Sequence, residues 1–140
     1  MSARAGRIYR DSSFYTDLDS GELKPKYFLV LAAPPGSDIV IRLLTSRYSS
    51  VRPEDPPCHQ GDPYPGFFLG IPGKALNHKT WLDLRKLEDL DAWDFNQHLA
   101  VGRISEVQTL PVDQLKAALA CAASADDTTR QQERLIRDVL

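Results

Sequence analysis

The stretch YFLVLAAPPGSDIVIRLLTS, residues 27–46, decides the fold. Two runs of mainly branched and aromatic apolar residues, 27–31 and 39–44, are separated by the breaker sequence PPGS at 34–37. Such runs favour β-strands, and a short Pro/Gly-rich turn between them predicts a β-hairpin. The second run ends in Thr45, Ser46 and Arg47, so two hydroxyls and a guanidinium follow a strand that is otherwise apolar.

Further β signals lie on both sides of this hairpin. Residues 12–24, which contain DLDSGE, predict a turn or loop before the first apolar run. The segments FFLGIPG (67–73) and KTWLDL (79–84) predict two more strands. The segment between Arg47 and Gly66 carries five prolines at positions 53–65, which predicts a long loop and excludes a helix there.

The second half of the chain predicts helices. Residues 85–99 have loose helical spacing, and the segment after Pro111 places Val112, Leu115 and Leu119 on one helical face. A last helix is expected from Asp127, as its N-cap, to Leu140. Strands followed by helices predict a mainly β fold, either a small barrel or an open sheet, with helices packed at one end. We expect one domain over 1–140, with a C-terminal helical extension from about residue 112 to 140.

Composition bounds the class of protein. The chain has 140 residues, of which 42% are hydrophobic and 26% charged, as expected for one compact domain. It shows neither the apolar run of a membrane helix nor the pattern of a secretory signal. Cys58 and Cys121 are far apart and match no disulfide framework, so a reducing cytoplasm is the expected compartment.

Charge is unevenly distributed along the chain. Residues 1–53 carry 8 Lys and Arg against 5 Asp and Glu, a net of +3, whereas residues 54–140 carry 9 against 14, a net of −5. A net charge of −2 argues against a broad surface for phosphates. A local basic cleft built from the first half remains compatible with this distribution.

The order of these segments resembles the MazF/PemK family of toxin endoribonucleases. The resemblance covers roughly residues 6–120 and is carried by GELKPKYFLVL, IVIRLLTS, TWLDL and GRIS…LPVDQLKAAL. It implies a small SH3-like barrel (PemK/CcdB-like), a homodimer, and a cognate antitoxin protein as partner. It also implies metal-independent cleavage of single-stranded RNA, with no cofactor.

The positions that match the family's motifs form the predicted site. The resemblance implies Lys26, Thr45 and Asp83 as catalytic residues and Glu22 and Ser46 as RNA-binding residues. Arg85 completes the catalytic set as a substitute for an arginine of the family. The chemistry of RNA binding adds Lys24 and Arg47 for electrostatic attraction and Trp81 for base stacking.

Two positions depart from the family pattern. Lys26 stands where the family usually has an arginine, so a bidentate grip on phosphate is lost. Trp81 stands where an arginine often precedes the aspartate by two residues. Arg85, two residues after Asp83, would lie on the same face of a strand and take its place.

The chemistry of RNA cleavage points to the same residues without the family. Attack by a 2′-hydroxyl needs a base, an acid, and donors that hold the phosphate. Asp83 with Lys26 or Arg85 could supply them, and the Thr45 and Ser46 hydroxyls could hold a phosphate oxygen. Four aromatic residues are candidates to stack on unpaired bases: Tyr48, Tyr64, Phe67 and Trp81.

Other readings remain open from the sequence. His59 or His78 could transfer protons, because imidazole titrates near neutral pH. Zinc is not expected, since closely spaced ligand pairs are missing. The acidic cluster Glu88, Asp89, Asp91 and Asp94 could hold Mg²⁺ in a metal-dependent nuclease, although a solvated acidic face is the simpler interpretation. The main alternative is a barrel without catalysis that binds a protein or nucleic-acid partner.

Overall fold

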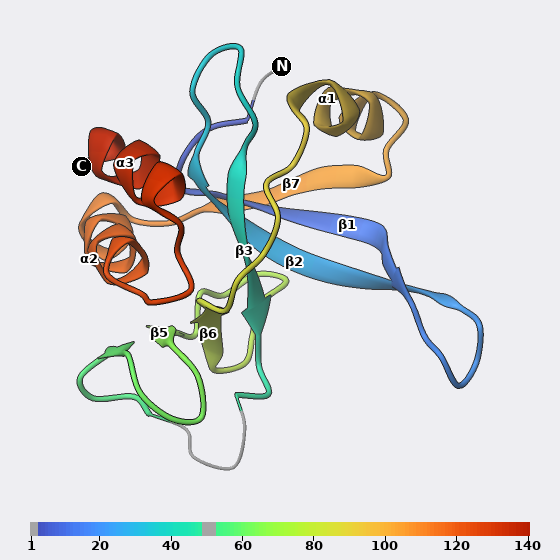
Figure 1. Ribbon diagram of the computed structural model, residues 1–140. Helices are drawn as coiled ribbons and strands as arrows, with labels where there is room; N and C mark the ends of the chain where they lie inside the picture. Colours follow the sequence, from blue (N-terminus) through green and yellow to red (C-terminus); the bar gives the residue numbers. More distant parts are fainter. Residues whose placement is uncertain (1–2, 49–52) are drawn as a thin grey trace.

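The computed structural model describes residues 3–48 and 53–140 and shows a mainly β protein (Figure 1). Seven strands and three helices follow one another along these residues. Their bounds are β1 (Arg7–Thr16), β2 (Leu23–Ala32), β3 (Val40–Thr45), β4 (Cys58–His59), β5 (Gly66–Gly70), β6 (Thr80–Asp83), α1 (Ala92–Ala100), β7 (Ile104–Thr109), α2 (Val112–Ala123) and α3 (Arg130–Val139).

The strands form one antiparallel sheet in the order β4-β5-β6-β3-β2-β1-β7. The predicted hairpin at 27–44 is confirmed as β2 and β3, which pair with Phe28 opposite Leu43 and Val30 opposite Ile41. The mainly β class is confirmed as well. A closed barrel is not formed, because in the described residues β4 and β7, at the two ends of the sheet, are not paired with each other.

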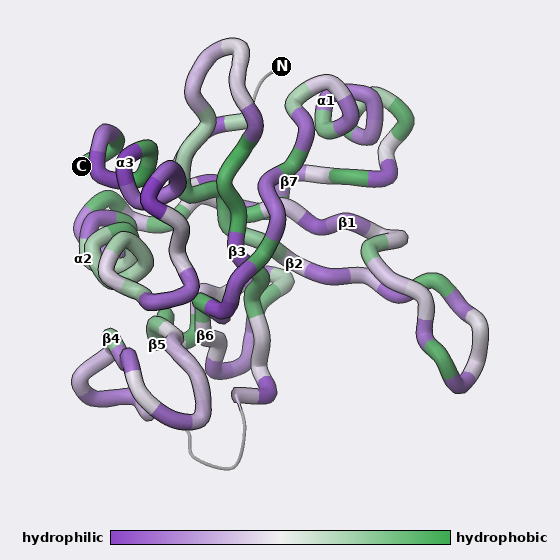
Figure 2. The backbone as a smooth tube through the Cα atoms, viewed as in Figure 1, coloured by the Kyte–Doolittle hydropathy of each residue, from purple (hydrophilic) through white to green (hydrophobic). Residues whose placement is uncertain are grey.

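The prediction of a loop over residues 12–24 is wrong. β1 continues to Thr16 and β2 begins at Leu23, so the two strands form a long hairpin arm that reaches away from the rest of the molecule (Figure 1). Only residues 17–22 make the turn, where the Asp17 carboxylate accepts a hydrogen bond from the backbone N–H of Asp19 at 2.8 Å. The sequence signal was weak because the paired residues of the arm are largely polar, as the purple segments of Figure 2 show.

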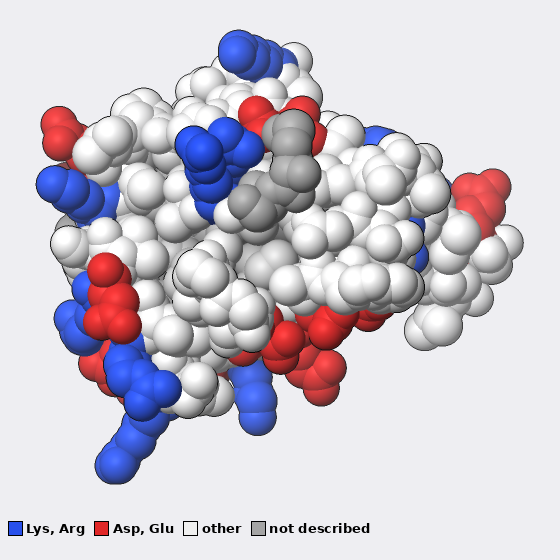
Figure 3. Space-filling view, turned by 90° about the horizontal axis from the view of Figure 1, so that it is seen from above, with Lys and Arg blue, Asp and Glu red and all other residues white. Residues whose placement is uncertain are grey.

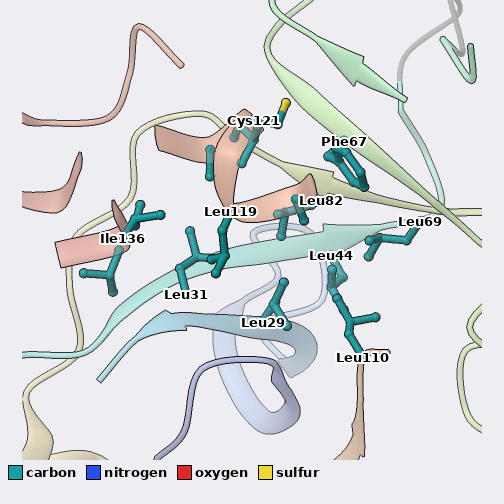
Figure 4. Close-up of a cluster of buried hydrophobic side chains, with 14 of the residues drawn as sticks. Leu29, Leu31, Leu44, Phe67, Leu69, Leu82, Leu110, Leu119, Cys121 and Ile136 are labelled. Atoms are coloured by element: carbon teal, nitrogen blue, oxygen red, sulfur yellow. The ribbon is translucent and has the colours of Figure 1, made fainter. Parts of the chain in front are cut away.

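Both faces of the central strands are buried. Leu29 and Leu31 join a core under α2 and α3, whereas Phe28 and Val30 join a second core with Phe95 of α1. A strand covered on both sides has a continuous apolar run rather than an alternating one, which explains the FLVLA sequence. Figure 4 shows side chains of the sheet converging on those of α2 and α3 in the larger core.

A buried polar network fastens α3 to the sheet. Arg42 on β3 is fully buried and donates to Gln132 Oε1 on α3 at 3.0 Å and to the Ile41 carbonyl at 2.8 Å. Gln132 also completes a capping box with Thr129, and it donates to Asp89 Oδ1 at 2.8 Å. The helix therefore begins after Thr129, not after Asp127 as expected, because Thr129 can bond the N3 backbone N–H.

The expectation that the two cysteines stay unpaired is wrong. Cys58 on β4 and Cys121 on α2 form a disulfide, with their Cα atoms 5.6 Å apart. The pairing is invisible in the sequence because 63 positions separate the cysteines and only the packing of α2 against β4 and β5 brings them together. The disulfide removes the ground for inferring a reducing compartment, and the cytoplasmic location stays a prediction. None of the described helices has the length and apolar character needed to cross a membrane.

Candidate functional site

A cavity of about 390 Å³ lies where the hairpin arm leaves the rest of the sheet. It is bordered by β2, by the end of β3 and by the segment that leads into β6. Residues that line it include Tyr15, Lys26, Thr45, Ser46, Arg47 and His78. The structure therefore brings four of the predicted site residues, Lys26, Thr45, Ser46 and Arg47, to one place. We call this hollow the β3-end cavity.

The local geometry explains how the end of β3 presents its polar groups. The Thr45 hydroxyl accepts a hydrogen bond from the Arg47 backbone N–H at 3.0 Å, which closes a turn directly after the strand. Since that bond uses an oxygen lone pair, the hydroxyl proton of Thr45 is left to donate to a ligand. On the opposite side, the Thr80 hydroxyl donates to the His78 carbonyl at 2.9 Å and fixes the backbone of the histidine.

The charge of the β3-end cavity favours an anion. Lys26 and Arg47 line it, and none of its lining residues within the described chain is acidic. The Lys26 Nζ lies 5.9 Å from the centroid of the Tyr15 ring, within reach of a cation–π interaction. Elsewhere the charges are mixed: Figure 3 shows acidic and basic side chains interspersed around the face of the molecule that it views. The basic residues of the β3-end cavity therefore form a local cleft and are not part of a broad basic surface.

Asp83 and Arg85 lie in a separate, smaller hollow with Leu43, Lys86 and Leu87. The two side chains bind each other: Arg85 donates through Nη2 to Asp83 Oδ2 at 2.7 Å and through Nε to Oδ1 at 3.1 Å. The Arg85 backbone N–H adds a bond to Oδ1 at 3.0 Å. Hydrogen bonding to Asp83 raises the pKa of the Arg85 guanidinium. Asp83, the predicted base, and Arg85, a predicted phosphate-binding residue, therefore bind each other.

Glu22 and Lys24 belong to the arm and do not line the β3-end cavity. They form an exposed ion pair with a Lys24 Nζ to Glu22 Oε2 distance of 3.2 Å. Exposed pairs of this kind contribute little to stability, about 0–1 kcal/mol. Both side chains therefore remain available to a ligand that extends along the arm from the cavity.

The expectation that Trp81 binds RNA is wrong. Trp81 is 1% exposed and its indole N–H donates to the Pro53 carbonyl at 2.8 Å. Its ring packs between Phe68 and Tyr48, with centroid distances of 5.1 and 5.9 Å. Tyr48 and Phe67 are buried too, so neither of them can stack on a base. Only Tyr64 of the four aromatic candidates is partly exposed, and it lies under the Arg85 guanidinium at 3.9 Å.

The buried aromatic residues form a structural cluster around Tyr48. Its hydroxyl donates to the Tyr64 carbonyl, and the two rings are 4.4 Å apart. Gly66 is required beside them, because a methyl group at that position would overlap the Tyr48 ring. Burial, with Tyr64 and Asp83 adding to it, raises the pKa of Tyr48 to about 12.

This cluster predicts a loss of stability in alkaline solution. The unfolded phenol has a pKa of about 10, so the folded state holds the Tyr48 proton more tightly. Its contribution is complete below pH 10 and is lost as the pH rises from about 10 to about 12. We expect on the order of 2 kcal/mol from this source. The free energy of unfolding in urea, measured from pH 8 to 12, should show the loss, and Tyr48→Phe should make this pH dependence flatter. Tyr15→Phe, which changes an exposed tyrosine, serves as the control. If the free energy of unfolding of Tyr48→Phe fell with pH as steeply as that of the wild type, Tyr48 would not be the source of the loss.

The acidic cluster has structural partners instead of a metal site. Asp91 caps α1 by accepting from the Asp94 backbone N–H at 2.9 Å, and Asp89 binds Gln132. Within 3–48 and 53–140, no three His, Cys, Asp or Glu residues are arranged to hold a metal ion. Of the histidines, His59 bonds the Asp62 carbonyl and His98 lies 3.3 Å from an Arg103 nitrogen. Only His78 lines the β3-end cavity.

Tyr15 is the cavity residue that the sequence did not reveal. It lies in the half of β1 that was expected to be a loop, opposite Lys24 of β2. The pairing of β1 with β2 places its ring, which is 45% exposed, next to Lys26. A polar strand with one aromatic residue carries no signal that would separate it from a loop.

Comparisons with known proteins place the chain in no family: no protein-family model, no curated protein and no solved structure matches it. The resemblance to the MazF/PemK family therefore stays a prediction from the sequence.

Proposed function

We propose that the protein is a metal-independent endoribonuclease that binds single-stranded RNA in the β3-end cavity, as a toxin of the MazF/PemK kind. One observation carries the proposal. Two cationic side chains, two hydroxyls and a histidine share a cavity in which none of the described lining residues is acidic. This set has donors suited to a phosphate and includes an imidazole, the side chain that most often serves as a general base.

Each group has a role in the proposed reaction. Lys26 and Arg47 attract the phosphate, and the Thr45 and Ser46 hydroxyls donate to its oxygens. The exposed ring of Tyr15 provides a surface on which an unpaired base can stack. These interactions favour an unpaired strand, because a base in a duplex cannot reach an aromatic side chain in this way.

His78 takes the role of general base in this proposal. It removes the proton of the 2′-hydroxyl, whose oxygen then attacks the phosphorus. The bond from phosphorus to the 5′-oxygen breaks, and the Lys26 ammonium donates a proton to that oxygen. The products are a cyclic phosphate and a 5′-hydroxyl. His78 replaces the predicted Asp83 because the Asp83 carboxylate is bound by Arg85 in a different hollow.

The fold, partners and location follow from the same resemblance. We propose that the unclosed sheet is a variant of the small SH3-like barrel of that family, and that the chain forms a homodimer in the cytoplasm. A cognate antitoxin would neutralise it. These statements rest on the sequence motifs alone.

The test is cleavage of an unstructured RNA by pure protein in excess EDTA. We expect cleavage to persist in EDTA and to fall by at least about 100-fold in His78→Asn, since general bases commonly contribute that much. Lys26→Ala should weaken RNA binding as well as cleavage. Lys74→Ala, which removes an exposed lysine outside the cavity, is the matched control. Activity that needs Mg²⁺, or that survives His78→Asn, contradicts the mechanism.

The same experiment examines a second candidate, a domain that binds RNA or protein without cleaving. The observation that favours it is the pairing of Asp83 with Arg85, which leaves the predicted base occupied. This candidate predicts RNA binding that depends on Lys26 and Arg47, with intact RNA recovered at every time point. Absence of both binding and cleavage would remove RNA as the ligand.

A further inference from the structure

A seam lies between the two ends of the unclosed sheet. Strand β7 pairs with β1 on one side only within the described residues. Beyond Phe68, strand β5 also lacks a sheet neighbour on the side away from β6: β4 pairs with Gly66 and Phe67, and the Phe68 N–H donates to the Pro57 carbonyl just before β4. The end of β5 and the residues after it border a cavity of about 710 Å³ whose other wall is β7 and the start of α2. We call this cavity the seam.

Two glutamine side chains form hydrogen bonds across the seam. In a closed barrel, hydrogen bonds between the backbones of two neighbouring strands would take this place. Gln114 Nε2 on α2 donates to the Leu69 carbonyl at 2.8 Å, and Gln108 Nε2 on β7 donates to the Pro72 carbonyl at 3.2 Å. Carboxamides have the same donor and acceptor groups as a peptide bond. The Leu69 and Pro72 carbonyls, which face the seam, therefore accept hydrogen bonds from side chains instead of from the N–H groups of a neighbouring strand.

Polar groups remain unsatisfied on the β7 side. The Gln108 Oε1 atom is buried and has no hydrogen-bond partner among the described residues. The N–H of Leu110, which directly follows β7, donates to the carbonyl of Gly6, which directly precedes β1, at 2.9 Å. Since neighbouring residues of a strand direct their backbone groups to opposite edges, the N–H and C=O of Thr109 point to the free edge. An exposed edge of this kind is a template for another strand.

The rim of the seam combines an exposed aliphatic residue with a cation. Ile71 lines the seam and is 61% exposed. Lys74 lies at the mouth with no ion-pair partner in the described chain, whereas Glu106 is already paired with Arg7 at 3.0 Å. A ligand with an apolar side chain and a carboxylate would complement this rim.

We propose that the seam binds an extended peptide segment of a partner protein, which adds as a strand to the edge of β7. The free edge selects an extended backbone, because only a strand can pair with its N–H and C=O groups. The exposed Ile71 selects an apolar side chain, and Lys74 selects an acidic residue. A segment of about five residues matches residues 106–110, the end of β7 and the residue after it, which border the seam. The proposal is independent of RNA cleavage, since the β3-end cavity shares no lining residue with the seam.

The probe is a displayed library of random nine-residue peptides, selected on the oxidised full-length protein. Enriched peptides should carry an apolar residue and a carboxylate. The Kd of the best peptide should rise at least about tenfold in Ile71→Asp. Leu23→Asp is the matched control, because Leu23 has the same 61% exposure but lies on the hairpin arm. The bound peptide should slow hydrogen exchange of the Thr109 amide.

Three outcomes overturn the proposal. The library yields no binder, or the selected peptides bind Ile71→Asp as tightly as the wild type, or Thr109 exchanges at the same rate with and without peptide. A fourth outcome replaces the occupant: protection of Thr109 that rises with protein concentration in the absence of peptide would show that a second copy of the chain fills the seam. RNA binding by Ile71→Asp should match the wild type in every case.

Discussion

Replacing Arg42 by alanine is expected to lower the free energy of unfolding by about 3–5 kcal/mol, the range for large buried side chains that lose their partners. The Arg42 side chain is fully buried between β3 and α3 and donates to three carbonyl or carboxamide oxygens, with the Leu87 carbonyl at 3.4 Å the most distant. Burial lowers the pKa of this arginine, and Asp89, Asp127 and Asp83 partly offset the effect. Alanine removes the guanidinium, leaves a void, and takes one hydrogen bond from each of the Ile41 carbonyl, the Leu87 carbonyl and Gln132.

Urea unfolding followed by tryptophan fluorescence and circular dichroism would measure the change. Arg7→Ala is the control: Arg7 forms a partly exposed pair with Glu106, and such pairs contribute about 0–1 kcal/mol. Arg42→Met keeps most of the volume and should cost less than Arg42→Ala, because the Arg42 Nε has no hydrogen-bond partner in the described structure. A cost below 1 kcal/mol for Arg42→Ala would show that the network does not fasten α3.

Reduction of the Cys58–Cys121 disulfide is expected to lower the free energy of unfolding by about 4 kcal/mol. The bond closes a loop with a sequence separation of 63, and the chain-entropy relation gives this value for such a loop. The disulfide joins β4 to α2, so its loss should loosen residues 53–65 before the central strands. Those residues contribute the Pro53 carbonyl to Trp81 and the Tyr64 carbonyl to Tyr48.

The measurement is urea unfolding with and without dithiothreitol, with free thiols counted by mass spectrometry. A Cys58→Ala, Cys121→Ala double variant should be destabilised like the reduced protein and should not respond to dithiothreitol. Equal unfolding midpoints for the oxidised and reduced protein, after full reduction is confirmed, would contradict the prediction.

Hydrophobic patterning was sufficient to locate most elements of this fold. The runs 27–31 and 39–44 could be identified as strands because each forms part of a buried sheet, and the turn between them has the residues that a turn needs. The helix after Pro111 was equally readable from its period. The outer half of β1 could not be found, since polar strands of a protruding arm have no buried face to impose alternation.

The candidate site was only partly accessible to sequence reasoning. Lys26, Thr45, Ser46 and Arg47 meet because β2 and β3 are consecutive paired strands, a contact that the hairpin already implied. Asp83 and Arg85 were expected beside them, but their positions depend on how β6 pairs with β3. In that pairing Trp81 stands opposite Thr45, and Asp83 lies toward a different hollow.

The sequence by itself determined the β2–β3 hairpin, the strands near 67–70 and 80–83 and the presence of the C-terminal helices, because these follow from local composition and period. Only the tertiary structure decided that Cys58 meets Cys121, that Trp81 is buried, and that Tyr15 and His78 join the β3-end cavity. It alone also decided that the sheet stays open at the seam. The physical reason is common to all of these features. Each depends on which segments, far apart in the sequence, pack together in the fold. This packing is set by the free energy of the whole chain, so no short stretch of sequence carries a pattern that predicts it.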